Sequence, residues 1–187
     1  MKMAAPMTSR SVLLACAIAA AIPQTALAGE LRLGVGAGAA AAGYDPCSYP
    51  GSNCDTPRTR MAGPAPLVLA GYRHRFPLRH GFALRAGGMM SAVLISPAAE
   101  TSTSVVSGAG EFGVQYDRFA ADVIAGLSFI RMSNDEMTGR GGTMLMGGQI
   151  SAKLSPELAA FGRIDLNAMM HGTVASAFIG VGLEWTP

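Results

Sequence analysis

The sequence predicts an all-β fold, an eight-stranded antiparallel up-and-down barrel that spans a membrane. Three observations support this class. Apolar residues alternate with small or polar ones, and the alternating segments are roughly ten residues long. Short and long connections between these segments mostly alternate along the chain. The composition agrees, because half of the residues are apolar and only 14% are charged. In hydrocarbon, closure into a barrel pairs every backbone N–H and C=O group of a sheet.

The last segment shows the alternation most clearly. Between Ala177 and Trp185 every second residue is apolar. The intervening positions are Phe178, Gly180, Gly182 and Glu184. A period of two is typical of a β-strand with two unlike faces. One face of this strand is therefore apolar and ends in tryptophan, whereas the other is mostly small and carries one carboxylate.

Seven earlier segments follow the same rule. The eight expected strands are about Glu30–Gly43, Leu67–Phe76, Phe82–Ile95, Val105–Tyr116, Phe119–Arg131, Thr143–Leu154, Leu158–Met169 and Ala177–Trp185. In the first three strands the outward residues are Leu31, Leu33, Val35, Ala37 and Ala39, then Val68, Ala70, Tyr72 and Phe76, then Phe82, Leu84, Ala86, Met90, Ala92 and Leu94. In the next three they are Val106, Phe112, Val114 and Tyr116, then Phe119, Ala121, Val123, Leu127 and Phe129, then Met144, Met146, Ile150 and Leu154. In the last two they are Ile164 and Leu166, then Ala177, Ile179, Val181, Leu183 and Trp185.

The connections predict which side of the membrane each end of the barrel faces. The short ones are Pro77–Gly81, Asp117-Arg118 and Ser155–Glu157. The other four are about Tyr44–Pro66, Ser96–Ser104, Ser133–Gly142 and Met170–Gly172. Membrane barrels have short periplasmic turns and longer extracellular loops, so we expect both ends of the barrel chain on the periplasmic side. The last loop is short for an outer loop, which departs from the pattern.

Six aromatic residues share the outward face and lie at the strand ends next to the short turns. They are Tyr72, Phe76, Phe82, Tyr116, Phe119 and Trp185. Aromatic girdles mark the level at which a barrel surface meets the lipid headgroups. Aromatic residues are favoured in strands generally, but their common end and common face favour a lipid-interface girdle.

The first 28 residues are typical of a secretory signal peptide. Lys2 and Arg10 precede a short apolar run, Ser11–Ile22, and Ala26-Leu27-Ala28 is a cleavage site of small residues before Gly29. The run is too short to cross about 30 Å of hydrocarbon as a helix. We therefore expect residues 1–28 to be a signal peptide and residues 29–187 to form one barrel domain.

Cys47 and Cys54 flank a segment rich in proline, glycine and serine. A local disulfide between them is the natural interpretation, because export takes a chain into an oxidising compartment. A metal site built on the two cysteines is the alternative, but no nearby histidine or second cysteine pair supports it. We expect neither a metal nor another cofactor.

The interior of an eight-stranded barrel is only wide enough for side chains to fill it. The inward positive residues are Arg32, Arg73, Arg75, Arg85, Lys153 and Arg163, and the negative ones are Glu30, Glu111, Asp122, Asp165 and Glu184. Because a buried unpaired charge is costly, we expect pairing across the lumen. The expected network is Arg85, Glu111, Asp122, Arg163, Asp165 and Glu184, with Glu111 and Asp165 as partners of Arg85 or Arg163. This predicts a polar plug rather than an open pore.

Together these features resemble the small OmpA/OmpX-type barrels of bacterial outer membranes, over the whole chain after the signal peptide. The resemblance implies an outer-membrane location, contact with outer-membrane lipids and lipopolysaccharide, and insertion by the barrel assembly machinery. The terminal residue of that family is usually aromatic, whereas here Thr186 and Pro187 follow Trp185. The periplasmic peptidoglycan-binding domain of full OmpA-type proteins is not expected.

Three functions stay open at this point. The first is a structural, envelope-integrity or adhesin-like role, with the long 44–66 loop as the expected site for a surface ligand. The second is a lipid A hydrolase, because the segment Phe129–Asn134 is faintly similar to the His-x-Ser-Asn signature of PagL-type deacylases. Arg131 stands where the general base should be and stays protonated, so His171 would have to reach Ser133 in a new arrangement.

The third function is that of a soluble periplasmic lipocalin-like ligand binder. It is disfavoured because the larger apolar residues share a face with the aromatic residues, whereas a lipocalin has its apolar face inside. The formal net charge of +2 leaves no electrostatic footprint for nucleic acid.

Overall fold

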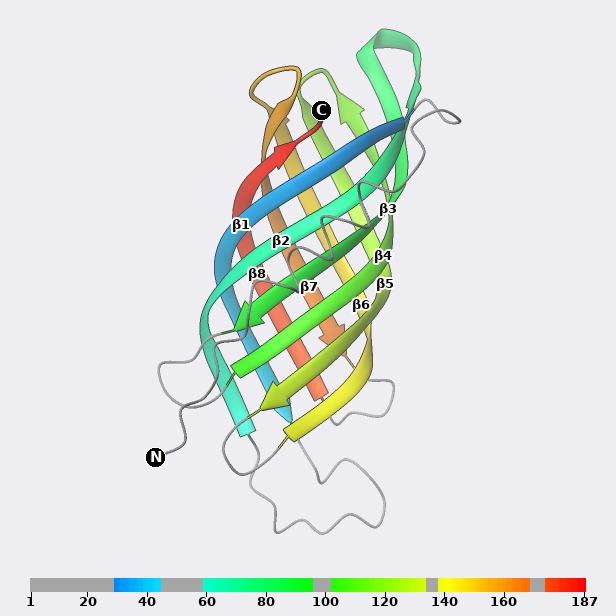
Figure 1. Ribbon diagram of the computed structural model, residues 1–187. Coiled ribbons are helices and arrows are strands. Elements are labelled where there is room, and N and C mark those ends of the chain that lie inside the picture. The colour runs from blue at the N-terminus through cyan, green and yellow to red at the C-terminus, as the bar shows by residue number, and fades with distance from the viewer. Residues whose placement is uncertain (1–28, 45–58, 96–101, 134–137, 169–173) are drawn as a thin grey trace.

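The computed structural model describes residues 29–44, 59–95, 102–133, 138–168 and 174–187, which form a closed antiparallel β-barrel (Figure 1). Its eight strands are β1 (Gly29–Tyr44), β2 (Thr59–Pro77), β3 (Phe82–Ile95), β4 (Ser102–Tyr116), β5 (Phe119–Ser133), β6 (Thr138–Lys153), β7 (Leu158–Ala168) and β8 (Val174–Trp185). Each strand pairs with the next along the chain, and β1 pairs with β8. The predicted fold class is confirmed.

No helix in the described ranges is long and apolar enough to cross a membrane.

The register of the sheet sets the tilt of the strands and the width of the barrel. Following the residue pairs once round the sheet from Leu33 leads back to β1 at Gly43, which is ten residues further along. In an eight-stranded barrel, strands are tilted by about 35–45° and the interior is filled by side chains. Figure 1 shows the steep slant of the strands.

Three tight connections join the strands at one end of the barrel, which lies at the top of Figure 1. Between β2 and β3, His80 and Gly81 take φ angles of 60° and 79° within a 3₁₀ turn at Arg79–Gly81. Asp117 takes a φ of 51° in the two-residue connection between β4 and β5. Glycine and aspartate accept this left-handed conformation more readily than most residues. The predicted short turns are therefore in place; we call this end the turn end and the opposite one the loop end.

At the loop end the strands extend further than expected. β2 begins at Thr59 instead of about Leu67, and β4 and β6 also begin several residues early. The expected loop over 44–66 is therefore wrong in its second part, because residues 59–66 pair with β1.

The two prolines of this segment explain why it reads as a loop. Pro64 and Pro66 lie opposite Ala39 and Ala37 of β1, whereas the described ladder between β2 and β3 starts only at Leu67. Proline has no N–H to donate and is tolerated on a strand edge that carries no second ladder.

Burial alternates along the strands as the parity predicts. In β5, Val123 is 65% exposed and the next residue, Ile124, is fully buried. Outward positions are exposed on the barrel surface, and inward positions fill the lumen. Met89 and Met90 show the same separation, since Met89 is buried in the lumen and Met90 is 54% exposed.

Candidate functional site

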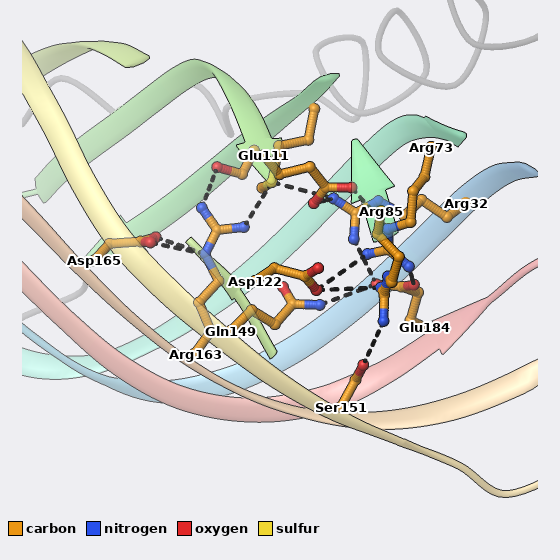
Figure 2. Close-up of polar contacts among 12 residues, drawn as sticks. Arg32, Arg73, Arg85, Glu111, Asp122, Gln149, Ser151, Arg163, Asp165 and Glu184 are labelled. Atoms are coloured by element: carbon orange, nitrogen blue, oxygen red, sulfur yellow. Dashed lines mark hydrogen bonds and ion pairs between the residues drawn. The ribbon is translucent and has the colours of Figure 1, made fainter. Parts of the chain in front are cut away.

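Eight buried charged side chains fill the half of the lumen next to the turn end (Figure 2). They form what we call the charged layer: Arg32, Arg73, Arg85, Glu111, Asp122, Arg163, Asp165 and Glu184. Each is at most 5% exposed. Four positive and four negative groups balance, which is the condition under which buried charges are tolerated.

Two arginines and two glutamates form the centre of the charged layer. Arg73 donates from Nε to Glu111 Oε1 at 2.8 Å and from Nη1 to Glu184 Oε1 at 3.1 Å. Arg32 donates from Nη1 to Glu184 Oε2 at 3.0 Å and also pairs with Glu111. Each carboxylate therefore bridges both guanidinium groups. Gln149 of β6 completes the cluster by donating to Glu184 Oε2 at 3.1 Å.

Asp122 and Arg85 form a looser part of the layer. Arg85 Nη2 lies 3.2 Å from Asp122 Oδ2, and Arg73 Nη2 lies 3.8 Å from the same oxygen. Neither Asp122 oxygen has a hydrogen bond of good geometry within the described protein. A cavity of about 20 Å³ between Arg85 and Lys153 has room for a water molecule, which buried polar groups commonly hold.

Arg163 and Asp165 pair on the same strand, β7. Arg163 Nε donates to Asp165 at 2.8 Å, and Nη2 donates to Ser91 Oγ across the lumen at 3.2 Å. Met89 lies between the central arginine–glutamate cluster and the Arg163–Asp165 pair. Its sulfur is 3.3 Å from Arg32 Nη2 and 3.5 Å from Arg163 Nη1.

All six charged residues of the expected network lie in the charged layer. Asp165 has the expected partner, Arg163. The expected partner of Glu111 was wrong, since Glu111 pairs with Arg32 and Arg73 instead of Arg85 or Arg163. Parity gives the face on which a residue lies, but the stagger of the strands decides which inward residues share a level.

Arg75 is a second correction, because it was expected inward and is exposed. The last pair between β1 and β2 is Gly29 with His74, so Arg75 lies beyond the end of that ladder. The β2–β3 hairpin projects past the barrel wall there, as Figure 1 shows, and has no lumen to face. Glu30 and Lys153 are half-buried at the same end.

A chain of neutral polar groups continues the network toward the loop end, and sequence reasoning missed it. Ser107 Oγ and Ser128 Oγ lie 2.6 Å apart. Asn167 accepts from Ser128 at 2.5 Å and donates to Ser176 at 3.1 Å. Inward parity was the available signal, but it does not reveal which small polar residues meet.

Apolar residues fill the other half of the lumen beside this polar chain. Twelve buried residues form what we call the apolar layer: Ala40, Ala42, Ala65, Leu67, Leu69, Val93, Ile95, Val105, Ile130, Met132, Phe161 and Phe178. Apart from Leu69 in the middle of β2 and Phe161 near the turn end of β7, they come from the loop-end parts of the strands. This layer was not expected from the sequence, from which we predicted a polar plug.

Two phenylalanine rings lie over inward glycines of β1 and β8. A methyl group on Gly36 or Gly182 would meet the Phe161 ring, and one on Gly180 would overlap the Phe178 ring. Gly36 and Gly182 pair directly across the β1–β8 ladder. The alternating glycines of these strands therefore make room for aromatic rings in a narrow barrel.

The six expected girdle residues lie on the outward face at the turn end. Five of them are about half exposed or more, and Tyr72 is half-buried. Phe82 and Tyr116 pair directly, with ring centroids 4.6 Å apart, and Tyr116 is also the partner of Phe119.

Several predicted features lie outside the described residues. They are the signal peptide 1–28, Cys47 and Cys54, and Asn134 and His171 of the hydrolase hypothesis. Within the described ranges, no three histidine, cysteine, aspartate or glutamate side chains are grouped so that they could hold a metal ion.

Comparison with known proteins gives a result at the level of fold. No family model matches the chain, and no curated protein sequence matches it. Among solved structures, the Neisserial surface protein A, NspA, is similar at 14% identity with a TM-score of 0.55, over 84% of this chain and 97% of that one. Ail, the attachment invasion locus protein of Yersinia pestis, is similar at 9% identity with a TM-score of 0.50, over 84% and 99%. Both are eight-stranded outer-membrane barrels. The chain therefore has the fold of the small eight-stranded outer-membrane β-barrels.

Proposed function

We propose that this chain is an integral outer-membrane barrel, closed to solutes, with a structural, envelope-integrity or adhesin-like role. The observation that carries the proposal is the separation of its two faces. Charged side chains are paired inside, whereas the outward surface between the two ends exposes residues such as Leu127, Ile150 and Val181 by 68–69%. Soluble monomers rarely expose apolar patches larger than a few hundred Å².

Lipid is the solvent that suits such a surface. The outward residues of β5 between Phe119 and Arg131 are all apolar, and the six-residue aromatic girdle borders this band at the turn end. We propose outer-membrane lipids and lipopolysaccharide as the partners of this face, and the barrel assembly machinery as the partner during insertion. The name of Ail, an attachment invasion locus protein, adds support for a surface-interaction role.

The filled lumen supports a role other than diffusion. A cavity of about 20 Å³ borders the charged layer at the turn end, and an open diffusion pore needs about sixteen strands. A ligand of the outer surface would then bind the loop end, where we propose the 44–66 region as the contact. The disulfide Cys47–Cys54 stays a prediction, which the mass of the unreduced and reduced protein tests.

Fractionation of cells that express the full chain tests the proposed location. We expect the protein in the outer-membrane fraction, with faster gel mobility before boiling than after it, because closed barrels resist detergent. Planar-bilayer recordings of the purified protein should show no conductance of porin size. A chain that is freely soluble without detergent would contradict the membrane proposal, and a large steady conductance would contradict the closed lumen.

We also propose that the chain is not a lipid A hydrolase. Arg131 is exposed on the outward face, and arginine cannot take the proton of a serine. Mass spectrometry of lipid A from cells with and without the protein should show the same acylation. A loss of one acyl chain that depends on Ser133 would overturn this proposal.

A further inference from the structure

Two arginines lie directly opposite each other on the outward face near the loop end. Arg131 of β5 pairs with Arg140 of β6, and both side chains are exposed. Like charges placed opposite each other on one face of a sheet are destabilising. No ion pair joins either arginine to an acidic side chain of the described chain. The pair therefore lacks a counter-charge within the part of the barrel that the structure describes.

Their height in the barrel places them at the edge of the apolar band. Arg131 lies twelve residues along β5 from Phe119 of the girdle. At about 3.4 Å per residue and a tilt of about 40°, this separation corresponds to roughly 30 Å along the barrel axis. The apolar band of a membrane barrel is about 25 Å tall, so the two arginines lie just beyond it.

The neighbouring outward residues support this placement. Phe129 lies one step toward the membrane on β5, is 49% exposed and faces Gly142. An aromatic residue followed outward by basic residues is the order expected where hydrocarbon gives way to anionic headgroups. Ser104 of β4 is the cross-strand neighbour of Arg131 on its other side and adds a hydroxyl group.

We propose that Arg131 and Arg140 form a binding site for a phosphate group of an outer-leaflet glycolipid such as lipid A. This inference rests on the proposed membrane location and lipid partners, and it adds the phosphate as the recognised group and the two residues that bind it. Two guanidinium groups on adjacent strands can share one phosphate, which relieves their repulsion and forms charge-assisted hydrogen bonds. The site faces the membrane, so the phosphate comes from a lipid that lies beside the barrel.

The test uses the purified full barrel in phosphatidylcholine vesicles, alone or with bisphosphorylated lipid A or phosphate-free lipid A. The variant is R131Q/R140Q, and the matched control is R79Q/R118Q, which removes two exposed arginines from the turn end. Midpoint temperatures come from heat-dependent gel mobility, and retained lipid is counted by native mass spectrometry.

Bisphosphorylated lipid A should raise the midpoint of the wild type and of R79Q/R118Q, and R131Q/R140Q should lose this increase. Retention of lipid A should fall about thirtyfold in that variant, because each of the two basic residues contributes about 1 kcal/mol near an anionic lipid surface. In phosphatidylcholine alone, R131Q/R140Q should be as stable as the wild type or more so, because the repulsion is gone. A purely structural role of the arginines would not produce this reversal.

Three results would overturn the inference. In the first, bisphosphorylated lipid A stabilises R131Q/R140Q as much as the wild type. In the second, phosphate-free lipid A stabilises the wild type as much as bisphosphorylated lipid A does. In the third, inorganic phosphate without lipid A does the same. Insertion is scored separately by the mobility shift of the unboiled protein. A chain that does not insert overturns the membrane proposal as well, whereas one that inserts without distinguishing these lipids overturns this inference alone.

Discussion

The two halves of the lumen are filled by opposite means. Near the turn end, four arginines and four carboxylates form ion pairs and hydrogen bonds, and several polar atoms there have no hydrogen-bond partner within the described protein. The apolar layer, most of which lies toward the loop end, contains aliphatic residues and two phenylalanines with no charge to satisfy. The filling of the first half depends on the pairing of charges, and that of the second depends on the packing of apolar side chains. A change of charge should therefore destabilise the charged half most, whereas a change of side-chain volume should destabilise the apolar half most.

The largest effect is expected for Glu111→Gln in the charged layer. It removes the charge shared by Arg32 and Arg73, and loss of one partner of a buried ion pair costs about 3–5 kcal/mol. Urea-dependent refolding into vesicles measures this loss. The isosteric change keeps the volume, so the loss reports charge rather than packing. If E111Q retains wild-type stability, pairing does not hold this half together.

The next largest effect is expected for Phe161→Ala in the apolar layer. Truncation of a buried phenylalanine costs about 3 kcal/mol through lost burial and the cavity that remains. The same refolding assay applies, with Phe161→Leu as the control that removes less volume and should recover most of the stability. Equal losses for alanine and leucine would show that shape does not decide the stability of this half.

A smaller effect, about 2 kcal/mol, is expected for Val123→Lys on the outward face. Val123 lies four residues from Phe119, within the proposed apolar band, and a lysine there must meet hydrocarbon. The control change Pro187→Lys, at an exposed position beyond β8, should cost nothing measurable. This pair of variants reports on the lipid-facing surface alone, because neither one changes a residue of the charged layer or of the apolar layer. Equal stability of V123K and wild type in vesicles would contradict a lipid-facing β5.

The smallest effect, about 1 kcal/mol, is expected for Ile130→Val at the loop end. Ile130 is 1% exposed, and the loss of one buried methylene group is typically of this size. Gln149→Glu, a similarly conservative change in volume, adds a negative charge beside Glu184 and should cost more. If the two conservative changes cost the same, the difference between the halves is smaller than we infer.

Parity in the sequence was sufficient for the faces of the strands but not for contacts across the lumen. Asp122 and Val123 were assigned correctly to opposite faces because a strand has a period of two. The partners of Glu111 depend on the ten-residue stagger of the closed sheet, which no local pattern encodes. Pro64 and Pro66 were expected in a loop. A strand tolerates proline there only because this part of β2 pairs with β1 and not with β3, which is seen only in the assembled barrel. The Arg131–Arg140 pair was missed for a similar reason, since only the register places the two side chains opposite each other.

The glycines under Phe161 and Phe178 have a consequence for biogenesis. A strand rich in glycine gives little guidance about alignment, so the first and last strands could slip past each other when the sheet closes. A shift of one residue would replace Gly182 by Val181 or Leu183 beneath the Phe161 ring, where a branched side chain does not fit. The two rings thus disfavour a shifted register between β1 and β8 when the barrel closes. The alignment of the closing strands therefore depends on side chains inside the lumen, which do not contact lipid.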